Sequence, residues 1–366
     1  MRRIPVTILT GFLGAGKTTL LNRLISEPGF GETAVIVNEF GEAGVDGGLI
    51  AQADERAFAM SVGCLCCTVS GDVRLTLLRL LEEAESGKGP NFDRVVIETT
   101  GLADPVPLIQ TFMTNDFMLS RFTLNGIVTL VDTVNGADAI ARFPEAQRQV
   151  AVADLILVTK SDLARDPASA RELSDLRDAL RRQNPNAELI DADEADAKTM
   201  FSLAAFDPAG KPPDAAEWLR FEDRSDDHSG HHHGHHHHDH HHHDDVNNHG
   251  ETASAFCFSA IEPVDPAALD GAVRALQSTF GPDLLRMKGL VEIEGHPYDP
   301  RVLHVVGHIA SPIRILDGWP DGVSQTRIVM IVSGPGRKGA ANMMTSFLPN
   351  LRPFKADAPS LAAAGS

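Results

Sequence analysis

The sequence has no excess of basic residues, no long hydrophobic run and few cysteines. Its 366 residues include 32 Lys and Arg against 50 Asp and Glu, which gives a formal net charge of −18. Nucleic acids and anionic membranes bind basic surfaces, so we expect neither as a partner. No run approaches the roughly 18 apolar residues of a membrane-spanning helix. Four cysteines cannot form a disulfide framework for a chain of this length, and we expect a cytoplasmic protein.

The composition divides the chain into four segments. In residues 1–206, short apolar runs alternate with helical patterns, which predicts an α/β domain with a parallel sheet covered on both faces. Residues 207–251 hold 13 of the 16 histidines with several Pro and Asp, and predict a disordered linker. Residues 252–350 predict a smaller α+β domain, and residues 351–366 predict a flexible tail.

The apolar runs and periodic patterns locate individual elements. The predicted strands are Val6–Thr10, Ala34–Asn38, Arg94–Glu98, Gly126–Asp132, Leu155–Thr159, Ala255–Ser259, Leu284–Ile293, Val302–Ile309 and Arg327–Ser333. The predicted helices are Thr18–Ile25, Asp72–Glu85, Ala168–Gln183, Pro266–Gln277 and Lys338–Phe347.

A phosphate-binding loop follows the first predicted strand. The run Gly11–Thr18 fits the P-loop pattern G-x-x-x-x-G-K-[ST] and precedes a helix. Glycines allow backbone N–H groups to point at phosphate oxygens, and the helix N-terminus adds its positive dipole end. We expect Lys17 to reach the terminal phosphates and the Thr18 hydroxyl to bind Mg²⁺. The predicted nucleotide-binding residues of the loop are Gly11, Gly14, Ala15, Gly16, Lys17, Thr18 and Thr19.

Two other strand ends complete the predicted nucleotide site. Glu98 is the expected acidic group of the magnesium shell, and the N–H of Gly101 is expected to sense the terminal phosphate. Lys160 and Asp162 follow another apolar strand. A carboxylate there accepts two hydrogen bonds that guanine offers and adenine does not, which predicts GTP and GDP as ligands. The predicted catalytic residues are Lys17, Thr18 and Glu98.

Three of the four cysteines, Cys64, Cys66 and Cys67, stand within four residues. Three thiolates at this spacing can bind one soft cation such as Zn²⁺ and leave a fourth coordination position open. A redox-active or buried cysteine cluster is the alternative. Oxygen ligands can come from a preceding loop, with Glu42 as the candidate fourth ligand among Glu39, Glu42 and Asp46.

The histidines of the linker form a second candidate metal site. Neutral imidazoles at high local density bind Zn²⁺, Ni²⁺, Cu²⁺ and Co²⁺ in overlapping, labile arrangements. The alternative is a solvated spacer. Labile metal capture is predicted at His231, His232, His233, His235, His236, His237 and His238.

Together these motifs resemble the CobW/HypB/UreG family of metal-handling P-loop GTPases, in its branch of CobW-type proteins and zinc chaperones. The resemblance implies GTP hydrolysis coupled to the transfer of a transition metal, commonly zinc, to a client metalloprotein. It also implies that the three cysteines are the transfer site and that the loop around residues 39–46 is a nucleotide-sensing switch. The motifs that carry it are Gly11–Thr19, Asn38–Gly41, Gly63–Cys67, Glu98–Pro105 and Thr159–Asp162.

Three functions fit these motifs. The first is a nucleotide-gated zinc chaperone, and the second is a GTPase that assists insertion of cobalt, cobalamin or another metal cofactor. The third is a histidine-tract metal buffer with a regulatory GTPase. Thiolate ligands favour zinc, although Co²⁺ or Ni²⁺ can replace it. Leu102 follows Gly101 where many small GTPases have a water-orienting Gln, so we expect slow turnover that metal, client or formation of a homodimer accelerates.

Overall fold

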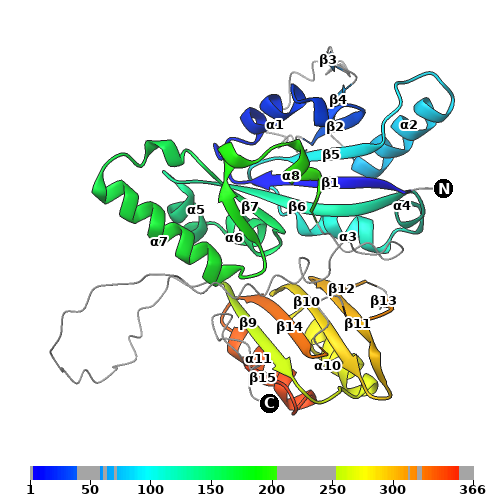
Figure 1. Ribbon diagram of the computed structural model, residues 1–366, viewed down its shortest axis with the longest axis vertical. Helices are drawn as coiled ribbons and strands as arrows, with labels where there is room; N and C mark the ends of the chain where they lie inside the picture. The colour runs from blue at the N-terminus through cyan, green and yellow to red at the C-terminus, as the bar shows by residue number, and fades with distance from the viewer. Residues whose placement is uncertain are drawn as a thin grey trace, which may run out of the picture.

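The computed structural model describes residues 3–38, 58–60, 64–69, 72–203, 253–311, 314–319 and 324–353. These residues form two sheets, each with its own helices (Figure 1). The predicted histidine-rich linker lies outside the described residues. Among the described helices, none is both long enough and apolar enough to cross a bilayer.

The N-terminal sheet has eight strands in the order β3-β4-β2-β5-β1-β6-β7-β8. Neighbouring strands are parallel except for the antiparallel pair β3–β4. Its strands are β1 (Ile4–Gly11), β2 (Thr33–Asn38), β3 (Phe58–Met60), β4 (Cys64–Val69), β5 (Arg94–Thr99), β6 (Phe122–Asp132), β7 (Leu155–Thr159) and β8 (Glu188–Asp191).

Helices cover both faces of this sheet because side chains of each buried strand alternate between the faces. Val6 and Ile8 of β1 pack with α2, α3 and α4, whereas Leu9 packs with α1 and α8. In Figure 1, α1 lies above the sheet and α3 lies below it. The helices are α1 (Lys17–Ile25), α2 (Val73–Glu85), α3 (Val106–Thr114), α4 (Asp116–Arg121), α5 (Gly136–Arg142), α6 (Pro144–Ala151), α7 (Pro167–Gln183) and α8 (Ala197–Phe201).

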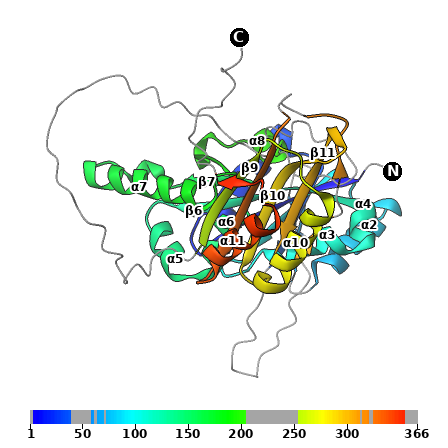
Figure 2. The same cartoon turned by 90° about the horizontal axis from the view of Figure 1, so that it is seen from below.

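The C-terminal sheet is antiparallel, with the order β12-β11-β10-β14-β9-β15 and with β13 also paired to β11. Two helices cover one of its faces, and Figure 2 shows them on the side turned away from the N-terminal domain. The elements are β9 (Ala253–Ala260), α10 (Pro266–Phe280), β10 (Leu284–Ile293), β11 (His296–Val306), β12 (Ile309–Ala310), β13 (Arg314–Ile315), β14 (Thr326–Ser333), α11 (Arg337–Phe347) and β15 (Arg352–Pro353).

The structure confirms the predicted fold class, a P-loop α/β domain followed by a smaller α+β domain, and differs in detail. The predicted strand Val302–Ile309 is wrong in its extent, because a turn at Gly307, with φ 60°, separates β11 from β12. The cysteine-containing strand β4 was not predicted. Pairing of Arg352 and Pro353 with β9 extends the sheet two residues into the segment expected to be a tail.

Buried charges join the two domains at the face of the C-terminal sheet that α10 and α11 leave free. Arg286 and Lys288 of β10 each lie 2.6 Å from Asp154 Oδ1, and the three side chains are 5, 3 and 9% exposed. Burial by itself would raise the pKa of Asp154, but the two cations hold that pKa well below its usual value. Removing one member of such a buried cluster leaves charge uncompensated, so the cluster fixes how the domains dock.

His304 of β11 lies beside this cluster, opposite Lys288 in the strand register. Burial and the positive charges of Arg286 and Lys288 lower the pKa of His304 well below its usual value, against an opposing effect of Asp154. The unfolded chain therefore binds a proton at this position below about pH 6.5 that the folded chain does not bind. The free energy of unfolding must then fall as the pH falls.

We expect His304→Gln to reduce the loss of stability on acidification from about pH 7.5 to about pH 5.5, because it removes a group that contributes up to about 1.4 kcal/mol per pH unit. Urea unfolding of the full-length protein at the two pH values measures the effect. His308→Gln is the matched control, since His308 is exposed in the next turn. Equal acid losses in wild type and His304→Gln would contradict the assignment.

Candidate nucleotide-binding and metal site

The predicted phosphate-binding loop connects β1 to α1. Gly14 and Gly16 have φ angles of 73° and 94°, a backbone region that L-residues with side chains rarely adopt. Gly16 is also the N-cap of α1, and it has no side chain to accept from the first N–H groups of the helix. These N–H groups and the helix dipole therefore face the concave side of the loop as an anion site.

Lys17 lies over the loop, with its ammonium held by the loop itself. Nζ donates to the carbonyl oxygens of Gly11, at 2.7 Å, and of Phe12, at 3.2 Å. Burial lowers the pKa of Lys17, and the nearby Glu98 carboxylate partly opposes this effect. The Lys17 ammonium is therefore held against the phosphate-binding loop by the carbonyl groups of that loop.

Thr18 and Glu98 meet where the ends of α1 and β5 converge. The Thr18 hydroxyl donates to Glu98 Oε1 at 2.8 Å, and the Glu98 side chain is buried. A hydroxyl and a carboxylate are oxygen donors of the kind that Mg²⁺ prefers. The donor set brought together here therefore fits the predicted magnesium ion.

Gly101 lies directly against the phosphate-binding loop. A Cβ at this position would stand 2.7 Å from Leu13 N and 2.8 Å from Leu13 Cα, closer than real side chains approach. Gln149 of α6 holds the same segment by donating from Nε2 to the carbonyl oxygens of Gly101, at 3.1 Å, and Ala103, at 3.0 Å. No local pattern predicts this role of Gln149, because its partners lie more than 40 residues away.

The end of β7 carries the predicted base-recognition residues. Thr159, which stands where Asn is more common in such motifs, donates to the carbonyl of Ala15 at 2.9 Å and so ties this strand end to the phosphate loop. Lys160 has φ 60°, and its Nζ lies 3.5 Å from Asp132 Oδ1. The Asp162 carboxylate is 63% exposed, so it is accessible to a base.

Asp132 lies beside the predicted base-recognition residues and was not among the predicted site residues, although it ends a predicted strand as Glu98 does. Its Oδ1 accepts from the backbone N–H of Val134, at 3.0 Å, and Asn135, at 2.8 Å. This buried carboxylate fixes the turn after β6 and anchors Lys160. The sequence pattern that could have identified it is an acidic residue at the end of an apolar predicted strand.

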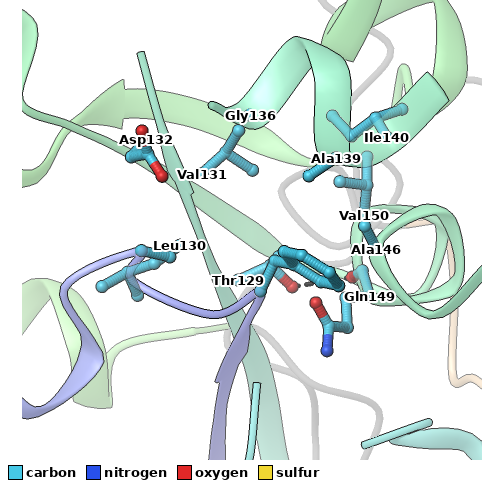
Figure 3. A pocket seen from close by; sticks show the side chains of 12 residues that line it. Thr129, Leu130, Val131, Asp132, Gly136, Ala139, Ile140, Ala146, Gln149 and Val150 are labelled. Atoms are coloured by element: carbon cyan, nitrogen blue, oxygen red, sulfur yellow. Dashed lines mark hydrogen bonds between the residues drawn. The ribbon is translucent and has the colours of Figure 1, made fainter. Parts of the chain in front are cut away.

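A small cavity lies behind the phosphate loop, between β6 and the helices α5 and α6 (Figure 3). Phe12 and Ala15 of the loop line it together with Gln149. The Thr129 hydroxyl at its wall donates to the carbonyl of Gln149 at 2.7 Å. The cavity is too small to hold a nucleotide, so it is not the nucleotide-binding site.

The three cysteines of the predicted metal site belong to β4. Cys66 pairs with Val35 of β2 and Cys67 with Ile36, which in turn pairs with Ile97 of β5, the residue before Glu98. Glu42 and the histidine tract lie outside the described residues. Among the side chains that the structure describes, there is no group of three or more His, Cys, Asp or Glu arranged to hold a metal ion.

Two family models match the chain. The nucleotide-binding domain of CobW/HypB/UreG matches residues 5–191, and the C-terminal domain of the cobalamin synthesis protein CobW matches residues 253–348.

Individual relatives cover different shares of the chain. Zinc chaperone YjiA of Escherichia coli K12 is 44% identical over 187 residues, which are 51% of this chain and 57% of YjiA. Zinc-regulated GTPase metalloprotein activator 1 of Schizosaccharomyces pombe is 37% identical over 195 residues, so the chain spans about half the length of these two relatives. Zinc chaperone CobW of a Sinorhizobium species is 30% identical over 326 residues, or 81% of this chain and 83% of CobW.

Two solved structures are similar to this structure over almost the whole chain. The crystal structure of Zn(II)-bound YjiA GTPase from E. coli matches with a TM-score of 0.68 at 31% identity, covering 96% of this chain and 99% of YjiA. A Zn(II)-bound triple mutant of YjiA matches with a TM-score of 0.69. The chain therefore belongs to the CobW/HypB/UreG family and carries the CobW type of C-terminal domain.

Proposed function

We propose that this protein is a GTP-hydrolysing metallochaperone that binds Zn²⁺ at Cys64, Cys66 and Cys67 and delivers it to a client metalloprotein. The observation that carries the proposal is the position of β4, which is separated from β5 by β2 alone. Neighbouring strands lie about 4.8 Å apart, so the cysteine strand is about 10 Å from the strand that bears Glu98. Metal held on β4 is close enough to respond to the nucleotide.

The nucleotide is held at three strand ends. The phosphates bind the loop after β1, the terminal phosphate lies near Gly101, and the base contacts Lys160 and Asp162. Lys17 exchanges its two carbonyl contacts for phosphate oxygens, which carry more negative charge. Thr18 and Glu98 would hold Mg²⁺, which would supply positive charge beside the transferring phosphoryl group. The remaining backbone contacts come from Gly11, Gly14, Ala15, Gly16 and Thr19.

The metal is cargo, which explains a site with only three cysteines. An open fourth position allows a ligand from the client to enter, and Glu42 is the proposed occupant before transfer. Thiolates and the names of the relatives both favour Zn²⁺ over Co²⁺ or Ni²⁺. The histidine tract, with His231–His233 and His235–His238, supplies labile capture before transfer.

Turnover is slow in this proposal until a partner completes the site. Leu102 is 47% exposed beside Gly101 and has no polar group to orient a water molecule. Client binding, metal loading or formation of a homodimer supplies the stabilisation of the hydrolysis transition state that Leu102 cannot provide.

We expect Asp162→Asn to change the base preference from guanine to xanthine. Xanthine carries a carbonyl oxygen where guanine has its exocyclic amine, so an amide can pair with it whereas a carboxylate cannot. Affinity for GDP should fall by about a hundredfold or more, and affinity for the xanthine nucleotide should rise. Asp178→Asn, an exposed helix position, is the control. Unchanged guanine preference would contradict the assigned role of Asp162.

We expect Cys66→Ser to weaken zinc binding by roughly a hundredfold, because a hydroxyl replaces one of three thiolates. Competition with a high-affinity zinc chelator measures this site separately from weak histidine sites. Cys257→Ser is the matched control, since Cys257 lies on β9 of the C-terminal domain. If the two variants bind zinc equally well, the cysteine motif is not the metal site. Removing residues 228–249 should lower zinc capacity and leave this tight site intact.

A further inference from the structure

We propose that Gln149 positions the segment Gly101–Asp104 for the terminal phosphate, and that α6 connects this segment to the C-terminal domain through Asp154. The proposal rests on the proposed role of Gly101 in sensing that phosphate. It adds a positioning residue to the nucleotide site and gives the C-terminal domain a part in nucleotide selection.

Gln149 is suited to hold this segment because both of its amide hydrogens are used there. Its side chain is 1% exposed, and Nε2 donates to the carbonyl oxygens of Gly101 and Ala103. Two carbonyl acceptors require the nitrogen to face them, which fixes the orientation of the amide. Oε1 is buried and accepts no hydrogen bond from the part of the chain that the structure describes. The segment therefore orients the amide. This orientation has a free-energy cost, because it leaves Oε1 buried without a hydrogen bond from the described residues.

The neighbouring residue of α6 holds the far end of the segment. Arg148 lies 2.6 Å from Asp104 Oδ2, and Asp104 Oδ1 accepts from the N–H of Val106 at the start of α3. Consecutive residues of one short helix thus contact both ends of a segment that has no regular secondary structure. Movement of the segment away from Leu13 must break these contacts or carry α6 with it.

The C-terminal end of α6 is held by the other domain. Ala151 packs with Leu285, Val329 and Ile331 of the C-terminal sheet. Arg286 donates to the carbonyl oxygens of Val152 and, at 3.0 Å, Ala153. Cations stabilise the free carbonyl groups at a helix C-terminus, so Arg286 binds the helix end as well as the Asp154 carboxylate. Eight residues of helix span only about 12 Å, so both sets of contacts act on one rigid body.

A second contact joins the same segment to the C-terminal domain through α3. Gln110 Nε2 donates to the carbonyl of Val306 at 3.0 Å, at the turn between β11 and β12. α3 begins two residues after Asp104. The segment is therefore connected to the C-terminal sheet at both of its ends, through α6 and through α3.

The experiment measures affinities of the full-length protein for GDP and for a non-hydrolysable GTP analogue. Gln149→Met keeps the length of the side chain and removes both donors. We expect it to weaken analogue binding by about tenfold or more and to leave GDP binding unchanged. Gln147→Met is the matched control, because Gln147 is buried in the same helix and donates to the carbonyl of Ile140, outside the segment. This control should leave the ratio of the two affinities at its wild-type value.

Two more variants complete the test. Arg148→Met, at a half-exposed position, should shift the ratio in the same direction and serves if Gln149→Met does not fold. Lys288→Met keeps the pair of Arg286 with Asp154. It should also lower the affinity for the GTP analogue relative to the affinity for GDP, by less than Gln149→Met does. Its effect and that of Gln149→Met should not be additive, because they act on the same helix.

Three outcomes would overturn the inference. Equal loss of GDP and analogue binding in both Gln149→Met and Arg148→Met would show that the contacts with the segment only support the fold. A wild-type ratio in Lys288→Met would show that the C-terminal domain does not reach the segment. If the wild-type protein binds neither guanine nucleotide, the proposed function itself fails, which is distinct from failure of these variants alone.

Discussion

The close approach of Gly101 to the phosphate-binding loop is the constraint on which the rest of the site depends. β1 and β5 are parallel neighbours, so the loop after β1 and the segment after β5 leave the sheet at the same edge. Only a glycine at position 101 allows the segment to touch the Leu13 backbone. The same edge brings Thr18 to Glu98 and places β4 two strands away. The phosphate-binding loop and Glu98 lie at the carboxyl ends of β1 and β5, whereas the cysteines stand earlier in their strand, β4, where Cys66 is level with Val96 and Cys67 with Ile97.

The docking of the two domains depends on buried charges rather than on a close backbone contact. Apolar faces alone can join sheets in several orientations, whereas an arrangement that separated the buried Asp154 from Arg286 and Lys288 would leave buried charge uncompensated. Burial together with Arg286 lowers the pKa of Lys288 to about 8, in spite of Asp154, which shows how strongly the cluster is removed from water. A protein that reports its nucleotide state across a domain boundary needs such a fixed arrangement. A loosely packed interface would absorb a small displacement of α6 without passing it on.

The sequence predicted those parts of the site that depend on neighbouring residues. Gly11–Thr18 has the pattern of its loop, and the predicted helix Ala168–Gln183 differs from α7 only by the Pro167 at its start. It could not predict β4, because a short run of Cys, Leu, Thr and Val becomes a strand only when β2 lies beside it. Contacts over long separations were equally hidden: Gln149 is 48 residues from Gly101, and Asp154 is 132 from Arg286. The hydrogen bond from the Thr159 hydroxyl to the carbonyl of Ala15 was hidden in the same way, because 144 residues separate the two.

In the proposed function, the bound nucleotide controls the affinity of the protein for zinc. The most direct test is a zinc competition titration of the protein loaded either with GDP or with a non-hydrolysable GTP analogue. We expect the two zinc affinities to differ by about tenfold or more, or about 1.4 kcal/mol of coupling, and we expect Cys66→Ser to abolish this difference. The same zinc affinity in both nucleotide states would contradict this expectation, because the edge of the sheet that holds the phosphates would then not influence the cysteines of β4.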